Sequence, residues 1–176
     1  ESQRVALALR KEGLEAWSCD IQDPSGGHPE LHIKGCAVEQ AYSGNWDMMI
    51  AFPPCTYLSK AGARWMFPTA GNRCSQRFKK AMEAKQFFIA LWNAPINHIC
   101  LENPTPLKCV ELPAPTQVIQ PFQFGEPYSK RTLLWLKNLP KLHPEKIMND
   151  YRPYLPSNTG KKNLRQNKKR VPNKER

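Results

Sequence analysis

The stretch Met48-Met49-Ile50-Ala51-Phe52-Pro53-Pro54-Cys55 decides the fold of this chain. Its five leading apolar residues predict a strand, and an unbroken apolar run is typical of a parallel strand that is buried on both faces. The two prolines end that strand, because proline fixes φ and lacks an N–H group. They predict a rigid loop at the strand's carboxyl end, where open α/β sheets bind ligands, and this loop presents Cys55.

Helix and strand patterns alternate on both sides of this stretch. The alternation predicts an α/β fold with a mostly parallel sheet covered by helices, and the last two strands are expected to form an antiparallel edge. Residues 56–74 read as a long loop and residues 140–156 as irregular. The predicted helices cover residues 5–13 and 75–93, and the predicted strands cover residues 14–20, 31–33, 46–52, 98–101, 118–122 and 132–136.

Positive charge is concentrated at the end of the 176-residue chain. Residues 161–176 contain eight Lys or Arg and one Glu, which gives +7 of the net charge of +11. We therefore expect one folded domain over residues 1–156 and a basic, disordered tail over residues 157–176. A basic tail favours a polyanion such as nucleic acid as partner, and a purely solubilising role is an equal alternative.

Several classes of protein are disfavoured by composition. No run of about 18 apolar residues is present, so no membrane span is expected, and no signal-peptide pattern opens the chain. The six cysteines form no CxxC pair, which favours reduced thiols in a cytoplasmic protein over disulfides or a zinc ribbon. His28, His32 and Cys36 have a spacing that suits a metal, but Pro29 breaks any helix that would align them, so no metal is expected.

A second polar cluster, Glu102-Asn103-Pro104, follows the strand pattern at 98–101. If both strands end at the same sheet edge, Cys55 and Glu102 share a cleft, where a thiolate adds to an electrophilic ring and an acid protonates a ring nitrogen. The thiol needs a nearby cation to raise its thiolate fraction, and Lys130-Arg131 is the candidate. A buried structural thiol, a turn carboxylate and a solvated basic pair remain the respective alternatives.

Pro53-Pro54-Cys55, Glu102-Asn103 and Lys130-Arg131 resemble, in order and approximate spacing, the motifs of the cytosine-C5 DNA methyltransferases. The resemblance is closest to a compact phage and prophage branch, and it spans about residues 1–145. It implies a Rossmann-like class I fold dependent on S-adenosylmethionine, here without its first strand and therefore N-terminally incomplete. The implied partner is DNA, and a monomer is expected.

The resemblance also implies a role for each matching residue. Cys55 would attack C6 of a flipped-out cytosine, and Glu102 would hold N3 and the exocyclic amine. Asn103 would help to fix the loop, and Arg131 would contact the base or the active-site loop. These four residues form the expected catalytic set.

The expected S-adenosylmethionine site gathers residues from three segments. Asp20, the acid after the second strand pattern, would bind ribose hydroxyls, and a residue that simply ends the strand is the alternative. The family's third motif has an aspartate where this chain has Cys36. Two alternatives stay open, namely a catalytically decayed DNA-binding module and a pyrimidine-C5 enzyme with another donor or acceptor. The expected cofactor residues are Glu1, Ser2, Asp20, Ile21, Pro53 and Pro54.

Overall fold

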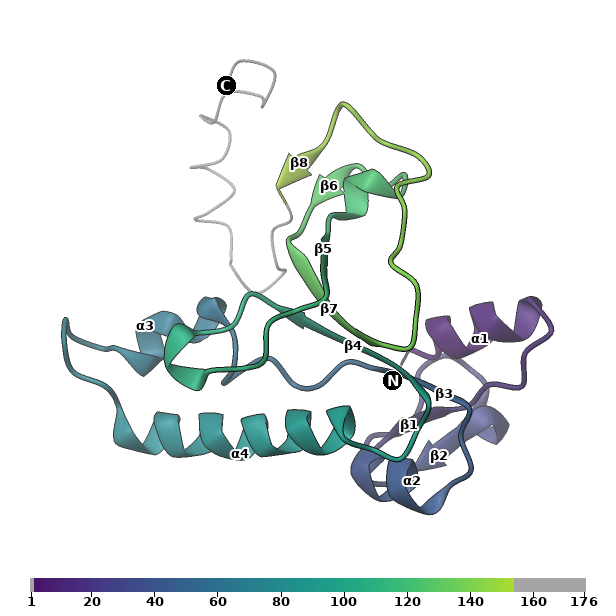
Figure 1. Cartoon of the computed structure of the whole chain (residues 1–176), viewed down its shortest axis with the longest axis horizontal. Helices are drawn as coiled ribbons and strands as arrows, with labels where there is room; N and C mark the ends of the chain where they lie inside the picture. Colours follow the sequence, from purple (N-terminus) through teal and green to yellow (C-terminus); the bar gives the residue numbers. More distant parts are fainter. Residues whose placement is uncertain (1, 154–176) are drawn as a thin grey trace.

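The computed structural model describes residues 2–153, so Glu1 and the predicted tail lie outside the described residues. The described chain is a mixed α/β fold (Figure 1). Its helices are α1 (Arg4–Lys11), α2 (Ala37–Ser43), α3 (Ala63–Met66) and α4 (Ser75–Trp92), with short 3₁₀ helices that include η2 (Lys60–Gly62) and η4 (Pro121–Gln123). Its strands are β1 (Ser18–Asp20), β2 (His32–Lys34), β3 (Met48–Ala51), β4 (His98–Pro104), β5 (Gln117–Ile119), β6 (Tyr128–Ser129), β7 (Thr132–Lys137) and β8 (Arg152–Pro153).

The main sheet has the strand order β3-β4-β7-β5 and is mixed rather than mostly parallel. β3 and β4 are parallel, with Met48 opposite His98 and Ala51 opposite Leu101. β7 is antiparallel to both β4 and β5, as the sequence predicted for the last two strands. β7 lies between β4 and β5 rather than at the edge, so two of the three strand pairings in this sheet are antiparallel.

The expectation that β3 is buried on both faces is wrong. All four of its residues are half-buried. The reason is its position, because β3 is an edge strand of the described sheet and hydrogen-bonds only to β4. Met49 and Ala51 still pack against the hydrophobic core, which places one face of the strand inside.

The core lies between the main sheet and α4, which runs along one face of the sheet (Figure 1). The helix follows the predicted amphipathic pattern and buries Ala81, Phe88 and Leu91. Phe88 meets Trp135 of β7 edge-to-face, with ring centroids 5.0 Å apart and an interplanar angle of 76°. Such aromatic pairs contribute about 0.5–1.5 kcal/mol beyond area burial, so this contact fixes α4 on the sheet.

A smaller unit precedes the main sheet. The predicted helix ends at Gly13, whose φ of +84° is the left-handed conformation that favours glycine at a helix end. β1 and β2 form a separate parallel pair, and α2 follows them. The sequence patterns did not predict α2, because seven residues are too few to show a helical period reliably.

The predicted loop at residues 56–74 contains short helical turns instead of a single irregular stretch. η2 and α3 follow each other directly, and an isolated bridge joins Thr69 to Asn72 before α4 begins. Met66 is fully buried and anchors this segment in the core. The region predicted as irregular at residues 140–156 includes β8, which pairs with β6.

Candidate functional site

Cys55 lies in a tight turn just after β3. Pro53 is buried and Pro54 is exposed, and the Cys55 side chain is half-buried. The Cys55 carbonyl accepts hydrogen bonds from the backbone N–H groups of Leu58 at 3.1 Å and Ser59 at 3.0 Å. The prolines end the strand as predicted, and the turn that follows fixes the backbone around the thiol.

The segment after Cys55 is attached to the segment after β4. Lys60 N–H donates to the Thr105 carbonyl at 2.9 Å, and Leu107 N–H donates to the Leu58 carbonyl at 2.7 Å. Leu58 and Ser59 are buried between these bonds. The loop that carries Cys55 is therefore tied to the continuation of the strand that carries Glu102.

Asn103 joins the same two segments on the other side of Cys55. Its side chain is 0% exposed, and Nδ2 donates to the Pro53 carbonyl at 2.7 Å. The Pro53 carbonyl belongs to the Pro53–Pro54 peptide bond, which has no N–H because its nitrogen is the ring nitrogen of Pro54. The hydrogen bond fixes the start of the Cys55 loop against β4, across 50 positions of sequence.

Glu102 lies in the last three residues of β4, which ends in Glu102-Asn103-Pro104 as the sequence predicted. β4 continues through Pro104, with Glu102 opposite Leu134 and Pro104 opposite Thr132 of β7. β3 must stop because its prolines cannot donate hydrogen bonds, whereas β7 supplies partners to β4 for three more residues. The Cys55 loop is tied to this end of β4, because Asn103, next to Glu102 in the strand, binds the Pro53 carbonyl.

The carboxyl group of Glu102 lies in a partly apolar environment. Burial raises its pKa, and the positive charge of Lys130 lowers it by a smaller amount. Oε1 is buried and has no hydrogen-bond partner among the described residues. A carboxyl group with a raised pKa retains a proton more readily, so Glu102 can act as a donor to a ring nitrogen.

A second thiol near Glu102 differs sharply from Cys55. Cys100 lies two positions before Glu102 on β4, so both side chains are on the same face of the strand. Burial and the neighbouring Glu102 charge raise the pKa of Cys100 to about 11. Cys100 is therefore an unreactive thiol at neutral pH, while Cys55 lies in a loop outside the sheet.

The two residues of the predicted cation pair, Lys130 and Arg131, have different surroundings. The Arg131 side chain is exposed and forms no hydrogen bond or ion pair with the part of the chain that the structure describes. Lys130, by contrast, acts electrostatically on Glu102. The structure thus places Lys130 rather than Arg131 near the acid. Adjacent basic residues in the sequence gave no signal to distinguish them.

Two of the expected cofactor residues, Asp20 and Ile21, lie in the smaller unit and carry groups that could contact a nucleoside. Asp20 ends β1, and its Oδ1 accepts a hydrogen bond from Gln22 N–H at 2.9 Å, which leaves further lone pairs free. Ile21 beside it is 72% exposed. An acceptor for hydroxyl groups next to an exposed apolar side chain fits the ribose and adenine of a nucleoside. Ser2 is exposed as well.

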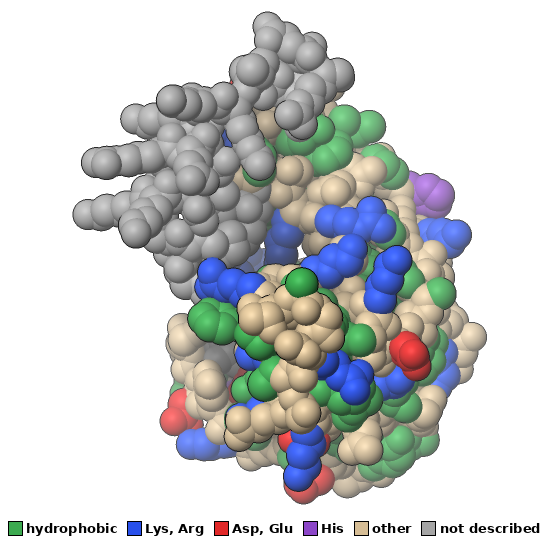
Figure 2. Space-filling view, turned by 90° about the vertical axis from the view of Figure 1, so that its left-hand side faces the viewer, with side chains coloured by type: hydrophobic (Ala, Val, Ile, Leu, Met, Phe, Trp, Pro, Cys, Tyr) green, Lys and Arg blue, Asp and Glu red, His purple; other side chains and the backbone are tan. Residues whose placement is uncertain are grey.

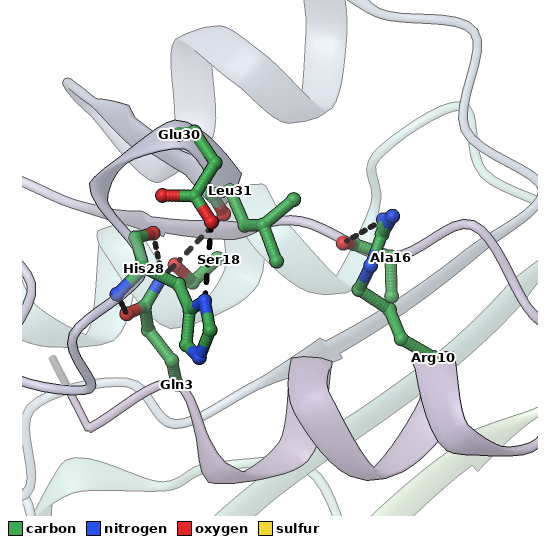
Figure 3. Close-up of polar contacts among 7 residues, drawn as sticks. All are labelled: Gln3, Arg10, Ala16, Ser18, His28, Glu30 and Leu31. Carbon is green, nitrogen blue, oxygen red and sulfur yellow. Dashed lines mark hydrogen bonds and ion pairs between the residues drawn. The ribbon is translucent and has the colours of Figure 1, made fainter.

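Sequence reasoning missed Gln3, which organises this unit (Figure 3). Gln3 is almost fully buried, with a left-handed φ of 57°. Nε2 donates to Ser18 Oγ at 3.2 Å and to the His28 carbonyl at 2.7 Å, and Oε1 accepts from His28 N–H at 3.2 Å. The side chain thus joins the start of α1 to β1 and to the loop before the 3₁₀ helix η1 (Pro29–Leu31). The only signal for Gln3 in the sequence is a polar side chain directly before the start of a helix.

Among residues 2–153, no group of three or more His, Cys, Asp or Glu side chains is placed to hold a metal ion. His32 contacts Ser18 Oγ at 2.9 Å and the Gln22 carbonyl at 3.0 Å instead. None of the described helices has both the length and the apolar character needed to cross a bilayer.

No family model, curated protein or solved structure matches the chain.

Proposed function

We propose that this chain is a DNA cytosine-C5 methyltransferase with a Rossmann-like class I core. The observation that carries the proposal is the buried hydrogen bond from Asn103 to Pro53, because it unites the Cys55 loop with the strand that holds Glu102. A half-buried thiol and a carboxyl group with a raised pKa are the two groups that addition to a pyrimidine ring requires.

In this mechanism Cys55 and Glu102 act together on a cytosine taken out of the base stack. The Cys55 thiolate forms a bond to C6 while Glu102 gives its proton to N3, so the displaced electron pair makes C5 nucleophilic. Lys130 balances the charge of Glu102 after the proton has left. Asn103 is a positioning residue, because it holds the Cys55 loop rather than the base.

S-adenosylmethionine, when bound, would supply the electrophilic methyl group that C5 accepts. Asp20 and Ile21 would hold its ribose and adenine, and Pro53 and Pro54 would border its methionine end. After C5 is methylated, a base removes the C5 proton, the Cys55–C6 bond breaks, and its electrons return to sulfur. Glu102 regains a proton for the next cycle.

DNA as the substrate is supported by charge. The chain carries +11 in total, and the last sixteen residues contribute +7 of it. We further propose a cytoplasmic monomer as the working form, in which reduced thiols persist; all six cysteines are free.

A mechanism-based trap tests this function. Duplex DNA that contains 5-fluorocytosine should form a covalent adduct with the wild-type protein in the presence of S-adenosylmethionine, because fluorine at C5 cannot leave as a proton does. Cys55→Ala should form none and should transfer no methyl group, whereas Cys109→Ala, another half-buried thiol, should behave as wild type. Normal methyl transfer by Cys55→Ala would exclude the mechanism.

A second candidate is a DNA-binding module without transferase activity. The observation in its favour is that β1 and β2 form a sheet of their own and do not hydrogen-bond to β3 among the described residues. The residues near Asp20 that would bind the nucleoside would then not belong to the same sheet as β3, which leads into the Cys55 loop. Titration with S-adenosylmethionine separates the candidates, since saturable binding favours the enzyme and its absence favours the module.

A further inference from the structure

A positively charged segment surrounds the Cys55 loop. Residues 48–82 contain no Asp or Glu, although they form β3, the Cys55 loop, η2, α3 and the first part of α4. Figure 2 views the molecule from the α3 side and shows Lys and Arg side chains interspersed with hydrophobic ones on this face. The basic residues of the segment are Lys60, Arg64, Arg73, Arg77, Lys79 and Lys80.

Within this segment lies a pocket of about 250 Å³, which we call the α3–α4 pocket. Aromatic rings and cations line it together, which is the combination that binds an aromatic base and its phosphate. The volume is slightly below the roughly 300–1,000 Å³ of pockets for drug-sized ligands, so it suits one nucleotide. The lining residues are Tyr57, Trp65, Cys74, Gln76, Arg77 and Lys80.

The two cations of the α3–α4 pocket are held in place before any ligand binds. The Arg77 guanidinium carbon lies 4.8 Å from the centroid of the Tyr57 ring, and Lys80 Nζ lies 5.6 Å from it. Arg77 Nη2 donates to the Thr56 carbonyl at 2.8 Å. Arg77 Nε is buried and has no hydrogen-bond partner among the described residues.

Trp65 supplies the aromatic surface. It is 57% exposed and lines the α3–α4 pocket, and the Arg64 guanidinium carbon lies 4.5 Å from its ring centroid. An exposed indole can stack with a base only if the face of that base is open. In a duplex both faces of each base are covered by neighbouring base pairs, so this surface favours an unpaired nucleotide.

We propose that the α3–α4 pocket binds one unpaired nucleotide of a DNA strand, with its phosphate at Arg77 and Lys80 and its base on Trp65. The pocket is next to the candidate nucleophile, because Thr56 and Tyr57 directly follow Cys55. The inference rests on the proposed function only for the identity of the neighbouring target base. It adds that the protein binds single-stranded DNA more tightly than duplex of the same sequence.

The test measures the binding of a fluorescein-labelled 12-nucleotide single strand, and of its duplex, to the full chain by fluorescence anisotropy at several salt concentrations. Trp65→Ala is matched by Trp17→Ala, since Trp17 is also exposed (41%) but lies before β1. Lys80→Ala is matched by Lys11→Ala at the end of α1. The basic tail is present in every variant, so its contribution cancels in each comparison.

Trp65→Ala should weaken single-strand binding by about 5-fold to 150-fold, the range for loss of one base stack. Lys80→Ala should weaken it and reduce the salt slope by about 0.7, the value for one phosphate on a single strand. Both matched controls should bind as wild type. Equal losses in Trp65→Ala and Trp17→Ala, or tighter binding of the duplex, would overturn the inference.

Cys55→Ala separates this inference from the proposed function. No methyl donor is needed for the binding measurement, so Cys55→Ala should bind the single strand as wild type does even though it transfers no methyl group. If the wild type binds single strands selectively but transfers no methyl group, the methyltransferase function is refuted and the nucleotide-binding role of the α3–α4 pocket is supported. If Trp65→Ala changes neither methyl transfer nor single-strand binding, the nucleotide-binding role of the α3–α4 pocket is refuted and the methyltransferase function is retained.

Discussion

Replacement of Asn103 by alanine isolates the contact that joins the Cys55 loop to β4. The change leaves the buried Pro53 carbonyl without its donor, which costs about 1–3 kcal/mol. The small cavity adds to that cost, and removal of the unpartnered Oδ1 offsets part of it. We therefore expect Asn103→Ala to lower the free energy of unfolding by about 1–3 kcal/mol.

Urea titration followed by tryptophan fluorescence measures this difference. Asn72→Ala is the matched control, because Asn72 donates a comparable hydrogen bond to Thr69 Oγ1 at 3.1 Å but does so at an exposed turn. Exposed substitutions of this kind change stability by about 0.5 kcal/mol or less. If both variants fall within that range, the Asn103 bond does not stabilise the loop and the reasoning fails.

The same variant has a local consequence that a general loss of stability does not produce. Once Pro53 is released from β4, the Cys55 thiol should be alkylated faster in native buffer, while Cys100 within β4 should react no faster than before. Peptide mass spectrometry after a timed iodoacetamide pulse reads each thiol separately. Equal acceleration at Cys55 and Cys100 would indicate global opening and would contradict a positioning role for Asn103.

Two further predictions follow from the buried groups of β4. Burial raises the pKa of Glu102 above its ordinary value of 4.5, so the stability that its proton provides is complete below that value and is lost as pH rises through the folded-state pKa. Glu102→Gln should therefore gain stability relative to wild type between pH 4 and pH 7 while losing methyl transfer, whereas the exposed Glu126→Gln should show no such trend; a flat difference for Glu102→Gln would contradict the burial effect. Because the pKa of Cys100 is about 11, this thiol should resist iodoacetamide at pH 8 in the native protein and react readily in urea, and rapid native modification would show that the thiol is not shielded.

Much of the candidate site could be predicted from local sequence, but its internal contacts could not. Pro53 and Pro54 announce the end of β3 by their lack of N–H groups, and the polar cluster at Glu102 is visible as a break in an apolar run. The extension of β4 through Pro104 depends on pairing with β7, about thirty residues away in sequence. Local patterns carry no information about such a partner, so the pairing of these residues with β7 could not be predicted.

Local sequence was enough to predict the α/β character of the chain, the amphipathic α4 and the loop that presents Cys55, because each depends on neighbouring residues only. Tertiary structure alone decided that β3 is an edge strand and that Lys130 rather than Arg131 acts on Glu102. It also decided that Asn103 binds Pro53. These outcomes depend on which distant segments meet, and burial then sets the strength of each polar contact that forms there.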